Sequence, residues 1–273
     1  MSVQEAQATI TLQEPLYYRY TPGSGLQPVT AKPAPIEAPI TLYINDRPWV
    51  TLLCTPSRLN YLALGFLYTS RVIQSLDDVL YMRVCEEDGV IEVRLPEGPE
   101  LDEALSRPRT LTSGCGGGTS FEAVEGLEPV SSATPVQPSD VLAAMHALHA
   151  SAETYRETGG IHTCGLSNGA DLLVVAEDVG RHNAVDKIVG ECLWNGTDTA
   201  DKWLLSSGRI SSEMALKAAR LRVPLVISHT SPTSLAIGVA CRLNVTLVGY
   251  AKAQKFNVYS GVERIAAPGV EAV

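Results

Sequence analysis

From residue 159 onward, short apolar runs alternate with polar loops and with segments of helical spacing, and this pattern constrains the fold most. The expected strands are residues 172–175, 203–205, 225–227 and 246–248. Two expected helices have the apolar spacing of a buried face. These apolar positions are Val185, Ile188, Val189 and Cys192 in one helix, and Leu235, Ala236, Val239, Ala240 and Leu243 in the other. Alternating strands and helices predict a largely parallel sheet covered by helices.

The first part of the chain has a different pattern, with more strands and a single helix. Apolar and polar residues alternate over 40–44, and residues 81–84 and 90–93 flank a turn-forming Glu-Asp-Gly sequence, which predicts a hairpin. Residues 61–73 have a helical pattern. Residues 23–39 contain several prolines, and we expect an exposed connection with little regular structure.

These patterns predict an α/β protein with a mixed or parallel sheet flanked by helices and a smaller N-terminal α+β region. We divide the chain into an N-terminal strand-rich region (1–110), a glycine-rich cysteine loop with a linker (111–138) and a C-terminal α/β domain (139–273). The last begins with a helix that we expect Ser139 and Asp140 to cap.

The charge of the chain excludes some classes of partner. The 273 residues carry a formal net charge of −9, whereas binding to nucleic acid or to an anionic membrane needs a field of Lys and Arg. No run approaches the roughly 20 apolar residues of a membrane span, and the first residues do not resemble an export signal. We therefore expect a cytoplasmic protein that binds neither nucleic acid nor membranes.

The chain has six widely spaced cysteines and no CxxC pair, which suits neither a disulfide framework nor a zinc ribbon. Cys54, Cys192 and Cys241 lie in apolar-periodic segments and are expected in the core. Only Cys115 and Cys164 have polar, loop-like neighbours. A zinc deaminase would need an HxE element and a downstream PCxxC, and the sequence has neither, so we predict no metal site.

Cys115 stands out because it lies among four glycines and three hydroxyl residues, in the segment Thr-Ser-Gly-Cys-Gly-Gly-Gly-Thr. Glycines free the backbone and let a ligand or partner approach closely. The segment is typical of a thiol displayed for chemistry. A tight turn with an inert thiol fits this motif alone about as well.

Polar segments follow the expected strands of the C-terminal part. They are residues 177–183, 206–212, 228–234 and 250–255. Ligands of such sheets bind beyond the carboxyl ends of the strands, where loops lead into helix N-termini. The cations Arg181, Arg209, Lys252 and Lys255 are therefore candidates to hold phosphates. The alternative is that residues such as Ser211 and Ser231 only cap helices.

Two histidines are further candidates. Asp178, His182 and Asp186 have i, i+4 spacing and would share a helix face, so His182 could exchange protons, contact a phosphate or make a structural bond. His162 lies close to two glycines. A cysteine hydrolase with Cys115 as nucleophile and either histidine as base stays open.

Two long motifs, residues 177–187 and 207–214, resemble those of the formate dehydrogenase accessory sulfurtransferases, the FdhD family. The resemblance extends to residues 159–162, to Pro232-Thr233 and to residues 255–261, in the family's order.

The resemblance implies a protein that takes sulfur from a cysteine desulfurase as a persulfide on Cys115. It would pass this sulfur to the molybdenum cofactor, bis(molybdopterin guanine dinucleotide), for formate dehydrogenase. The family's cofactor-binding stretch matches Tyr250, Ala251, Lys252, Ala253, Gln254 and Lys255. The resemblance further implies a cytidine deaminase-like fold and a homodimer, and GDP would mimic part of the cofactor. The alternative is a non-catalytic chaperone that only binds the cofactor.

The chain departs from the family at two places. Many members have a CGxC pair, whereas Gly118 stands here in place of the second cysteine, so no disulfide can form within the motif. Ser70 and Arg71 stand where the family commonly has Glu-Gly. A single-cysteine relay needs only that the Cys115 thiol be deprotonated.

Overall fold

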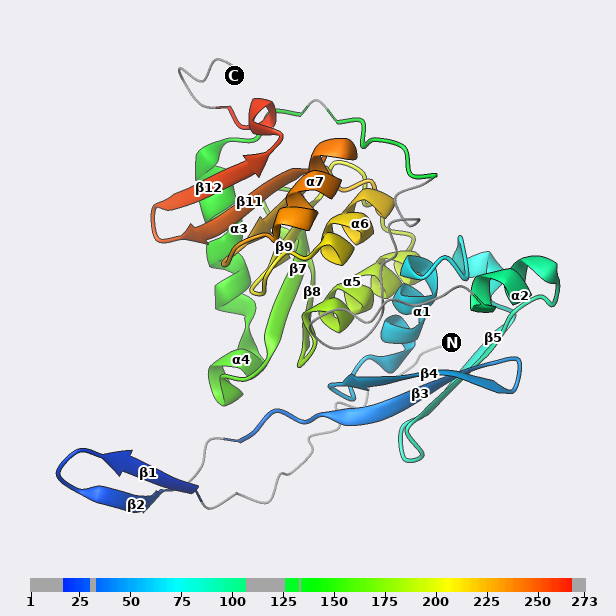
Figure 1. Ribbon diagram of the computed structural model, residues 1–273, viewed down its shortest axis with the longest axis horizontal. Coiled ribbons are helices and arrows are strands. Elements are labelled where there is room, and N and C mark those ends of the chain that lie inside the picture. Colours follow the sequence, from blue (N-terminus) through cyan, green and yellow to red (C-terminus); the bar gives the residue numbers. More distant parts are fainter. Residues whose placement is uncertain (1–16, 30–32, 107–125, 133, 267–273) are drawn as a thin grey trace.

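The computed structural model describes residues 17–29, 33–106, 126–132 and 134–266, which form two sheets with their helices and a separate hairpin (Figure 1). The predicted α/β class with a smaller N-terminal region is confirmed. Cys115 and its glycine-rich segment lie outside the described residues.

The larger sheet contains six strands in the order β12-β11-β10-β9-β7-β8. Their bounds are β7 (His162–Ser167), β8 (Leu172–Asp178), β9 (Trp203–Ser206), β10 (Leu225–Ser228), β11 (Thr246–Lys252) and β12 (Lys255–Ser260). All four predicted strands are present. The neighbours β9, β10 and β11 pair in parallel, whereas β7 pairs antiparallel with both β8 and β9, and β12 pairs antiparallel with β11. The sheet is therefore mixed: the four predicted strands β8 to β11 run in one direction, and β7 and β12, which were not predicted, run against them.

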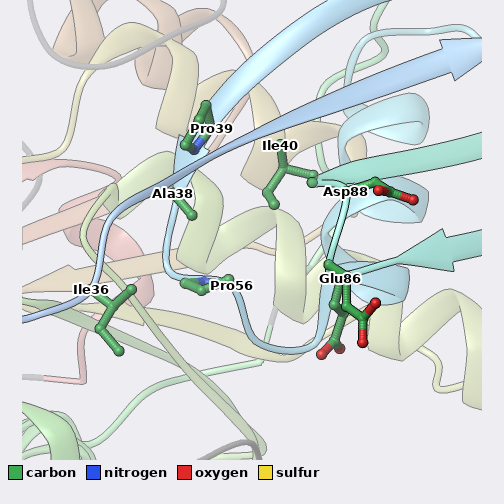
Figure 2. Close-up of a pocket in the computed structure, with 9 residues that line it drawn as sticks. Ile36, Ala38, Pro39, Ile40, Pro56, Glu86 and Asp88 are labelled. Carbon is green, nitrogen blue, oxygen red and sulfur yellow. The ribbon is translucent and has the colours of Figure 1, made fainter. Parts of the chain in front are cut away.

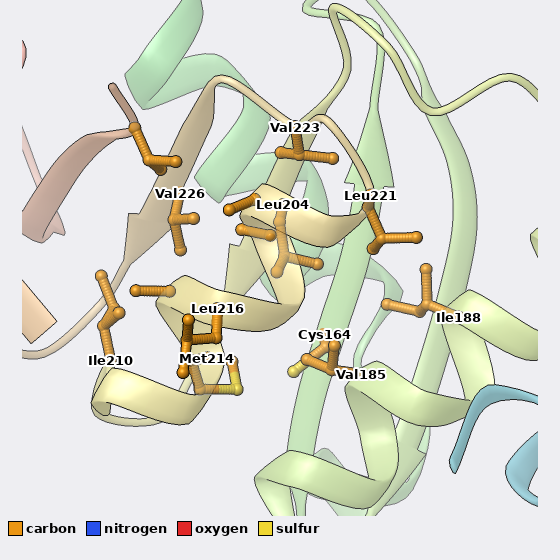
Figure 3. Packing of buried hydrophobic residues seen from close by; sticks show 14 of the residues in the cluster. Cys164, Val185, Ile188, Leu204, Ile210, Met214, Leu216, Leu221, Val223 and Val226 are labelled. Atoms are coloured by element: carbon orange, nitrogen blue, oxygen red, sulfur yellow. The ribbon is translucent and has the colours of Figure 1, made fainter. Parts of the chain in front are cut away.

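Helices cover both faces of this sheet (Figure 1). They are α3 (Pro138–Ser151) on one face and α5 (Arg181–Asn195), α6 (Ser212–Arg220) and α7 (Ser234–Arg242) on the other, with α4 (Glu153–Thr158) and the short η3 (Val262–Arg264) at the periphery. The side chains of successive strand residues point to opposite faces of the sheet. Leu204 therefore packs in the cluster of α5, α6 and α7 (Figure 3), and Leu205 packs in the cluster of α3. The continuous apolar runs follow from this two-sided burial.

The predicted buried face of α5 is confirmed at all four positions. In α7 the prediction holds for Ala236, Val239, Ala240 and the following Leu243, whereas Leu235 is 44% exposed. The predicted cap of α3 was wrong. The helix begins at Pro138, whose ring is suited to the first turn, and its N-cap is Gln137, without a side-chain capping bond.

The smaller sheet has the order β4-β3-β6-β5 and packs on α1. Its elements are β3 (Ala38–Ile44), β4 (Arg47–Cys54), α1 (Leu59–Thr69), η1 (Leu76–Asp78), β5 (Tyr81–Cys85), β6 (Val90–Arg94) and α2 (Pro99–Ser106). The predicted hairpin is the antiparallel pair β5–β6. This four-stranded sheet and α1 share a hydrophobic core and together form the smaller N-terminal region.

The helix predicted over 61–73 ends at Thr69, and Arg71 explains why. Arg71 has φ 61°, in the left-handed region that closes helices and favours glycine. The amide of Val72 donates to the carbonyl of Leu67 at 3.0 Å and completes the turn. Arg71 therefore occupies a position at which the glycine common in the family would meet no steric penalty.

Two further strands, β1 (Tyr17–Thr21) and β2 (Gly25–Val29), form an antiparallel hairpin of their own. The expectation of little regular structure over 23–39 was therefore wrong for its first residues and for those that belong to β3. Residues 33–37, between β2 and β3, have no regular structure.

The two sheets are joined where α1 crosses α5, and two glycines allow that crossing. A Cβ on Gly65 would lie 1.8 Å from the carbonyl oxygen of Asp186, and a Cβ on Gly190 would lie 1.9 Å from that of Tyr61. The backbones of the two helices are thus in direct contact, and no other residue fits at either position.

A buried ion pair fastens the same junction. Lys187 Nζ lies 2.7 Å from Asp178 Oδ2, and both side chains are fully buried. Lys187 also donates to the carbonyl of Thr55 at 3.0 Å, and the amide of Thr55 donates to Asp178 at 3.1 Å. Asn183 Nδ2 donates to the carbonyl of Leu53 at 2.9 Å. Residues of α5 and β8 thereby hold the end of β4.

A second buried cluster links α5, α6 and α1. Lys217 Nζ lies 2.7 Å from Asp186 Oδ2 and 3.3 Å from Glu213 Oε1, and Thr69 donates to Asp186 at 2.8 Å. Burial opposes the charge of Lys217, but the two carboxylates outweigh it and raise its pKa. Burial raises the pKa of Glu213 from 4.5 to about 7, although Lys217 acts in the opposite direction.

We expect Gly190→Ala to lower the free energy of unfolding by about 3 kcal/mol or more, because the added methyl group meets backbone rather than a side chain that can move. The measurement is urea unfolding. The matched control is Gly238→Ala in α7, where a Cβ would meet nothing within 4 Å. Helix propensity alone predicts a gain of up to about 1 kcal/mol for the control. Equal effects of the two substitutions would contradict the close crossing.

The raised pKa of Glu213 predicts that the free energy of unfolding depends on pH. Between about pH 4.5 and 7 the folded chain keeps a proton on Glu213 that the unfolded chain releases. Its contribution to stability is therefore full below pH 4.5 and declines as pH rises towards 7. In Glu213→Gln this decline, on the order of 3 kcal/mol, should vanish from the pH profile of unfolding. The exposed Glu157→Gln should keep the wild-type profile, and an unchanged profile in Glu213→Gln would contradict the assignment.

Candidate functional site

The polar segments that follow β9, β10 and β11 meet at one edge of the larger sheet. The amide of His229 donates to the carbonyl of Ser206 at 3.1 Å, and Ser228 Oγ donates to the carbonyl of Gly208 at 2.7 Å. The amide of Tyr250 donates to the carbonyl of Thr230 at 2.9 Å. These bonds place residues 206–212, 228–234 and 250–255 in a row, as expected for the carboxyl ends of parallel strands.

The start of α5 joins the row. A Cβ on Gly208 would lie 3.0 Å from both Arg181 Cδ and His162 Nδ1, so the absence of a side chain at Gly208 leaves room for these two residues. His162 Nδ1 lies 3.5 Å from Ser207 Oγ. Burial lowers the pKa of His162, and the nearby Arg181 and Arg209 lower it further, so the site favours a neutral imidazole.

Residues 250–255 form the end of the β11–β12 hairpin. Tyr250 and Ala253 have φ near 54°, and Lys252 pairs with Lys255 across the turn. Tyr250, Lys252, Ala253, Gln254 and Lys255 are exposed, whereas Ala251 is 1% exposed and packs in the core of the α3 face. Ala251 can therefore offer a ligand its backbone only.

The Lys252–Lys255 pair could hold an anion. Two like charges directly opposite on a hairpin repel each other, which destabilises the turn when no counter-charge is bound. A phosphate between the two ammonium groups would remove this cost and gain charge-assisted hydrogen bonds. The exposed Arg209 adds a further cation in a neighbouring segment of the row.

His182 has a structural environment. The expectation that Asp178, His182 and Asp186 share a helix holds for His182 and Asp186, four residues apart in α5, and was wrong for Asp178, the last residue of β8. His182 Nε2 lies 2.9 Å from Ser211 Oγ, its Nδ1 lies 3.7 Å from Glu213, and it is 2% exposed. His182 thereby connects α5 to the start of α6.

The capping interpretation holds in part. The Ser211 hydroxyl accepts from the amide of Met214 and caps α6. In α7 the cap is Thr233, which accepts from Ala236, and not the predicted Ser231. Ser211 and Thr233 therefore act as the N-caps of α6 and α7.

A contact between two histidines was missed by the sequence analysis. His149 Nε2 lies 3.0 Å from His229 Nδ1, and the rings meet edge to face. Burial, together with His229 and His146, lowers the pKa of His149. His229 belongs to a polar segment identified from the sequence, but nothing in the sequence indicates a partner on α3.

The structure corrects the interpretation of two cysteines. Cys164 does not lie in a loop but in β7, fully buried, and burial raises its pKa to about 12. Cys241 was expected in the core and is exposed. Cys54 and Cys192 are buried as predicted, with pKa values raised by burial to about 12 and about 11.

A pocket with a volume of about 410 Å³ lies away from this edge, at the start of β3 and the β5–β6 turn (Figure 2). Within the described ranges no three His, Cys, Asp or Glu side chains gather as a metal site would need. In the same part of the chain, every helix is too short or too polar to span a bilayer.

Comparisons with known proteins identify relatives of this chain. Residues 35–266 match the FdhD/NarQ family. The chain is 38% identical to the sulfur carrier protein FdhD of Bacillus subtilis (strain 168) over 232 residues, which cover 84% of this chain and 88% of the relative. It is 36% identical to the protein of that name in Listeria monocytogenes serotype 4b (strain F2365), with coverages of 84% and 90%.

A solved structure agrees with this result. The crystal structure of a putative formate dehydrogenase accessory protein from Desulfotalea psychrophila matches with a TM-score of 0.76 and 30% identity. The match covers 92% of this chain and 98% of that one. Sequence and structure lead to the same conclusion, that this chain belongs to the FdhD/NarQ family.

Proposed function

We propose that the protein is a sulfurtransferase that carries sulfur from a cysteine desulfurase, as a persulfide on Cys115, to the molybdenum cofactor of formate dehydrogenase. The observation that carries this proposal is membership of a family whose relatives named above are sulfur carrier proteins. The family resemblance implies that Cys115 is the cysteine that carries the persulfide.

The first chemical step needs only one thiol. The Cys115 thiolate attacks the outer sulfur of the donor persulfide, a new S–S bond forms on Cys115, and the donor cysteine leaves as a thiolate. No net oxidant or reductant is needed, because one persulfide replaces another. Gly118 in place of a second cysteine therefore does not prevent loading.

The sheet edge supports the second half of the proposal. Tyr250, Lys252, Ala253, Gln254 and Lys255 offer exposed groups, Ala251 offers backbone, and the opposed ammonium groups of Lys252 and Lys255 suit a phosphate. Bis(molybdopterin guanine dinucleotide) carries diphosphates as well as guanine, and GDP presents the same two features. We infer that this hairpin binds the cofactor as cargo.

The location, oligomeric state and partner proteins are inferred from the sequence and from the family resemblance. We infer a cytoplasmic homodimer that contacts a cysteine desulfurase and formate dehydrogenase in turn. A chaperone that binds the cofactor without sulfur chemistry would use the same hairpin, so ligand binding alone does not separate the two functions. Detection of added sulfur on Cys115 does separate the sulfurtransferase from the chaperone.

Incubation with a cysteine desulfurase and cysteine should add about 32 Da per sulfur to the Cys115 peptide, in a form that a reductant removes. Peptide mass spectrometry measures this. Cys115→Ala should lose the signal and keep its fold, since the glycine-rich sequence around Cys115 predicts a loop, where a substitution costs little stability. Cys241→Ser, which removes an exposed thiol, should load as the wild type does. If Cys115 gains no sulfur although the cysteine desulfurase is active, the result would favour the chaperone function.

Replacing both hairpin lysines, in Lys252→Ala/Lys255→Ala, should weaken GDP binding by about tenfold or more, because two charge-assisted contacts are lost. Isothermal titration calorimetry gives the affinity. The control is Arg222→Ala, which removes an exposed cation near the opposite ends of the parallel strands. Equal affinity for GDP in the wild type and the double variant would show that the nucleotide binds elsewhere than at the hairpin.

A further inference from the structure

Three polar side chains lead from the interior to the polar edge of the larger sheet. Ser211 Oγ lies 2.9 Å from His182 Nε2, and His182 Nδ1 lies 3.7 Å from Glu213 Oε2. His182 is 2% and Glu213 is 8% exposed, whereas Ser211 is partly exposed. We call Ser211, His182 and Glu213 the relay. Capping of α6 uses one acceptor position of Ser211 and does not fix the direction of its hydroxyl proton.

Lys217 decides which oxygen of Glu213 takes up a proton. Lys217 Nζ lies 3.3 Å from Glu213 Oε1 and donates to it. Glu213 Oε2 is buried and has no hydrogen-bond partner within the described ranges. A buried acceptor without a donor is costly, and a proton on Oε2, aimed at His182 Nδ1, removes this cost. A shift of a few tenths of an ångström brings these two atoms within hydrogen-bond distance.

The charges around Glu213 allow this proton to move near neutral pH. Burial, together with Asp186 on α5, favours the acid, whereas Lys217 on the same helix and Arg181 on α5 favour the carboxylate. Their balance raises the pKa of Glu213 to about 7. Because His182 faces this carboxyl group, the two side chains share one proton and titrate as a pair.

The shared proton fixes the direction of the Ser211 hydroxyl. When it is present, His182 carries hydrogen on Nε2, whether Glu213 is an acid or the imidazole is a cation. Nε2–H and the amide of Met214 then both donate to Ser211 Oγ, which fills its two acceptor positions, and the hydroxyl donates outward. When the proton is absent, the carboxylate favours Nδ1–H. Nε2 then accepts from the hydroxyl, and Ser211 presents a lone pair to the edge.

The surroundings of Ser211 are cationic. Arg209 is exposed and lies two residues before Ser211, and Arg181 directly precedes His182 in α5. Both arginines are close enough to His162 to lower its pKa. An oxyanion beside these cations gains a charge-assisted bond from a hydroxyl donor and is repelled by a hydroxyl lone pair.

We infer that Ser211 binds an oxyanion of the phosphate or sulfate type when the relay holds its shared proton, and that His182 and Glu213 are the positioning residues that set this preference. Binding of the anion near neutral pH therefore takes up a proton. The inference goes beyond the proposed function, because neither Cys115 nor the hairpin lysines take part in it.

The test follows sulfate binding to the full chain by NMR, because sulfate keeps its charge near neutral pH. The amide of Met214, which bonds to Ser211, reports occupancy of the site. Sulfate should bind about tenfold or more tightly at about pH 6 than at about pH 8, because a donor replaces a lone pair. The ring nitrogens of His182 should show hydrogen on Nε2 at the lower pH and a lone pair there at the higher pH.

Glu213→Gln should gain affinity, a result that a loss of structure does not produce. Lys217 holds the amide oxygen, so the amide NH2 group faces His182 Nδ1 and copies the protonated acid. This variant should bind sulfate at about pH 8 as tightly as the wild type does at about pH 6. The matched control is Glu157→Gln, which changes an exposed carboxylate and should keep the pH dependence of the wild type.

Two substitutions test the hydroxyl itself. Ser211→Thr keeps a hydroxyl and an N-cap and should keep the pH dependence, whereas Ser211→Ala should lose it. GDP in place of sulfate identifies the source of the oxyanion. A Met214 shift at an about tenfold lower concentration of GDP than of sulfate assigns the oxyanion to a nucleotide, and a shift at equal or higher concentration assigns it to a free anion.

Three results would overturn the inference. They are a Met214 amide that sulfate does not shift, equal sulfate affinity at both pH values, and hydrogen on His182 Nε2 at both. The wild-type measurements decide the matter even if a variant fails to fold. None of these results touches the sulfur loading of Cys115 or the binding of GDP at the hairpin.

Discussion

The contact between α1 and α5 governs the rest of this structure. Each sheet has a core of its own, and the two become one body because Gly65 and Gly190 let two helix backbones touch. Close contact excludes water from the polar groups around the crossing. These groups must then satisfy one another, and the pairs Asp178–Lys187 and Asp186–Lys217 do so. The buried charges are thus a consequence of the crossing.

This arrangement explains what the longest motif of the chain does. Asp178, Asn183, Asp186 and Lys187 all belong to it, and each bonds to β4, to its following residues or to a neighbouring helix. Only its first part, with Arg181, reaches the polar edge of the sheet. The motif that carries the family resemblance is therefore mainly the joint between two sheets, and the exposed hairpin of β11 and β12 offers the groups for a ligand.

The sequence allowed the prediction of elements whose signal is local. Apolar periodicity located the strands β8 to β11 and the buried face of α5, because burial on two sides leaves a continuous apolar run. Strand direction at the sheet edges depends on hairpins that periodicity does not encode. The proximity of the polar segments followed from a general rule about strand ends. The contact between His149 and His229 joins residues 80 positions apart, and no local pattern reports it.

The buried thiols limit the exchange of sulfur between cysteines of this protein. Burial raises the pKa of Cys54 and of Cys164 to about 12, which keeps both thiols protonated at neutral pH, and thiol–persulfide exchange requires the ionised form. Exchange of sulfur with these two buried thiols is therefore strongly disfavoured. A persulfide on Cys115, as proposed above, would therefore not pass its sulfur to the thiols of Cys54 and Cys164 in the interior.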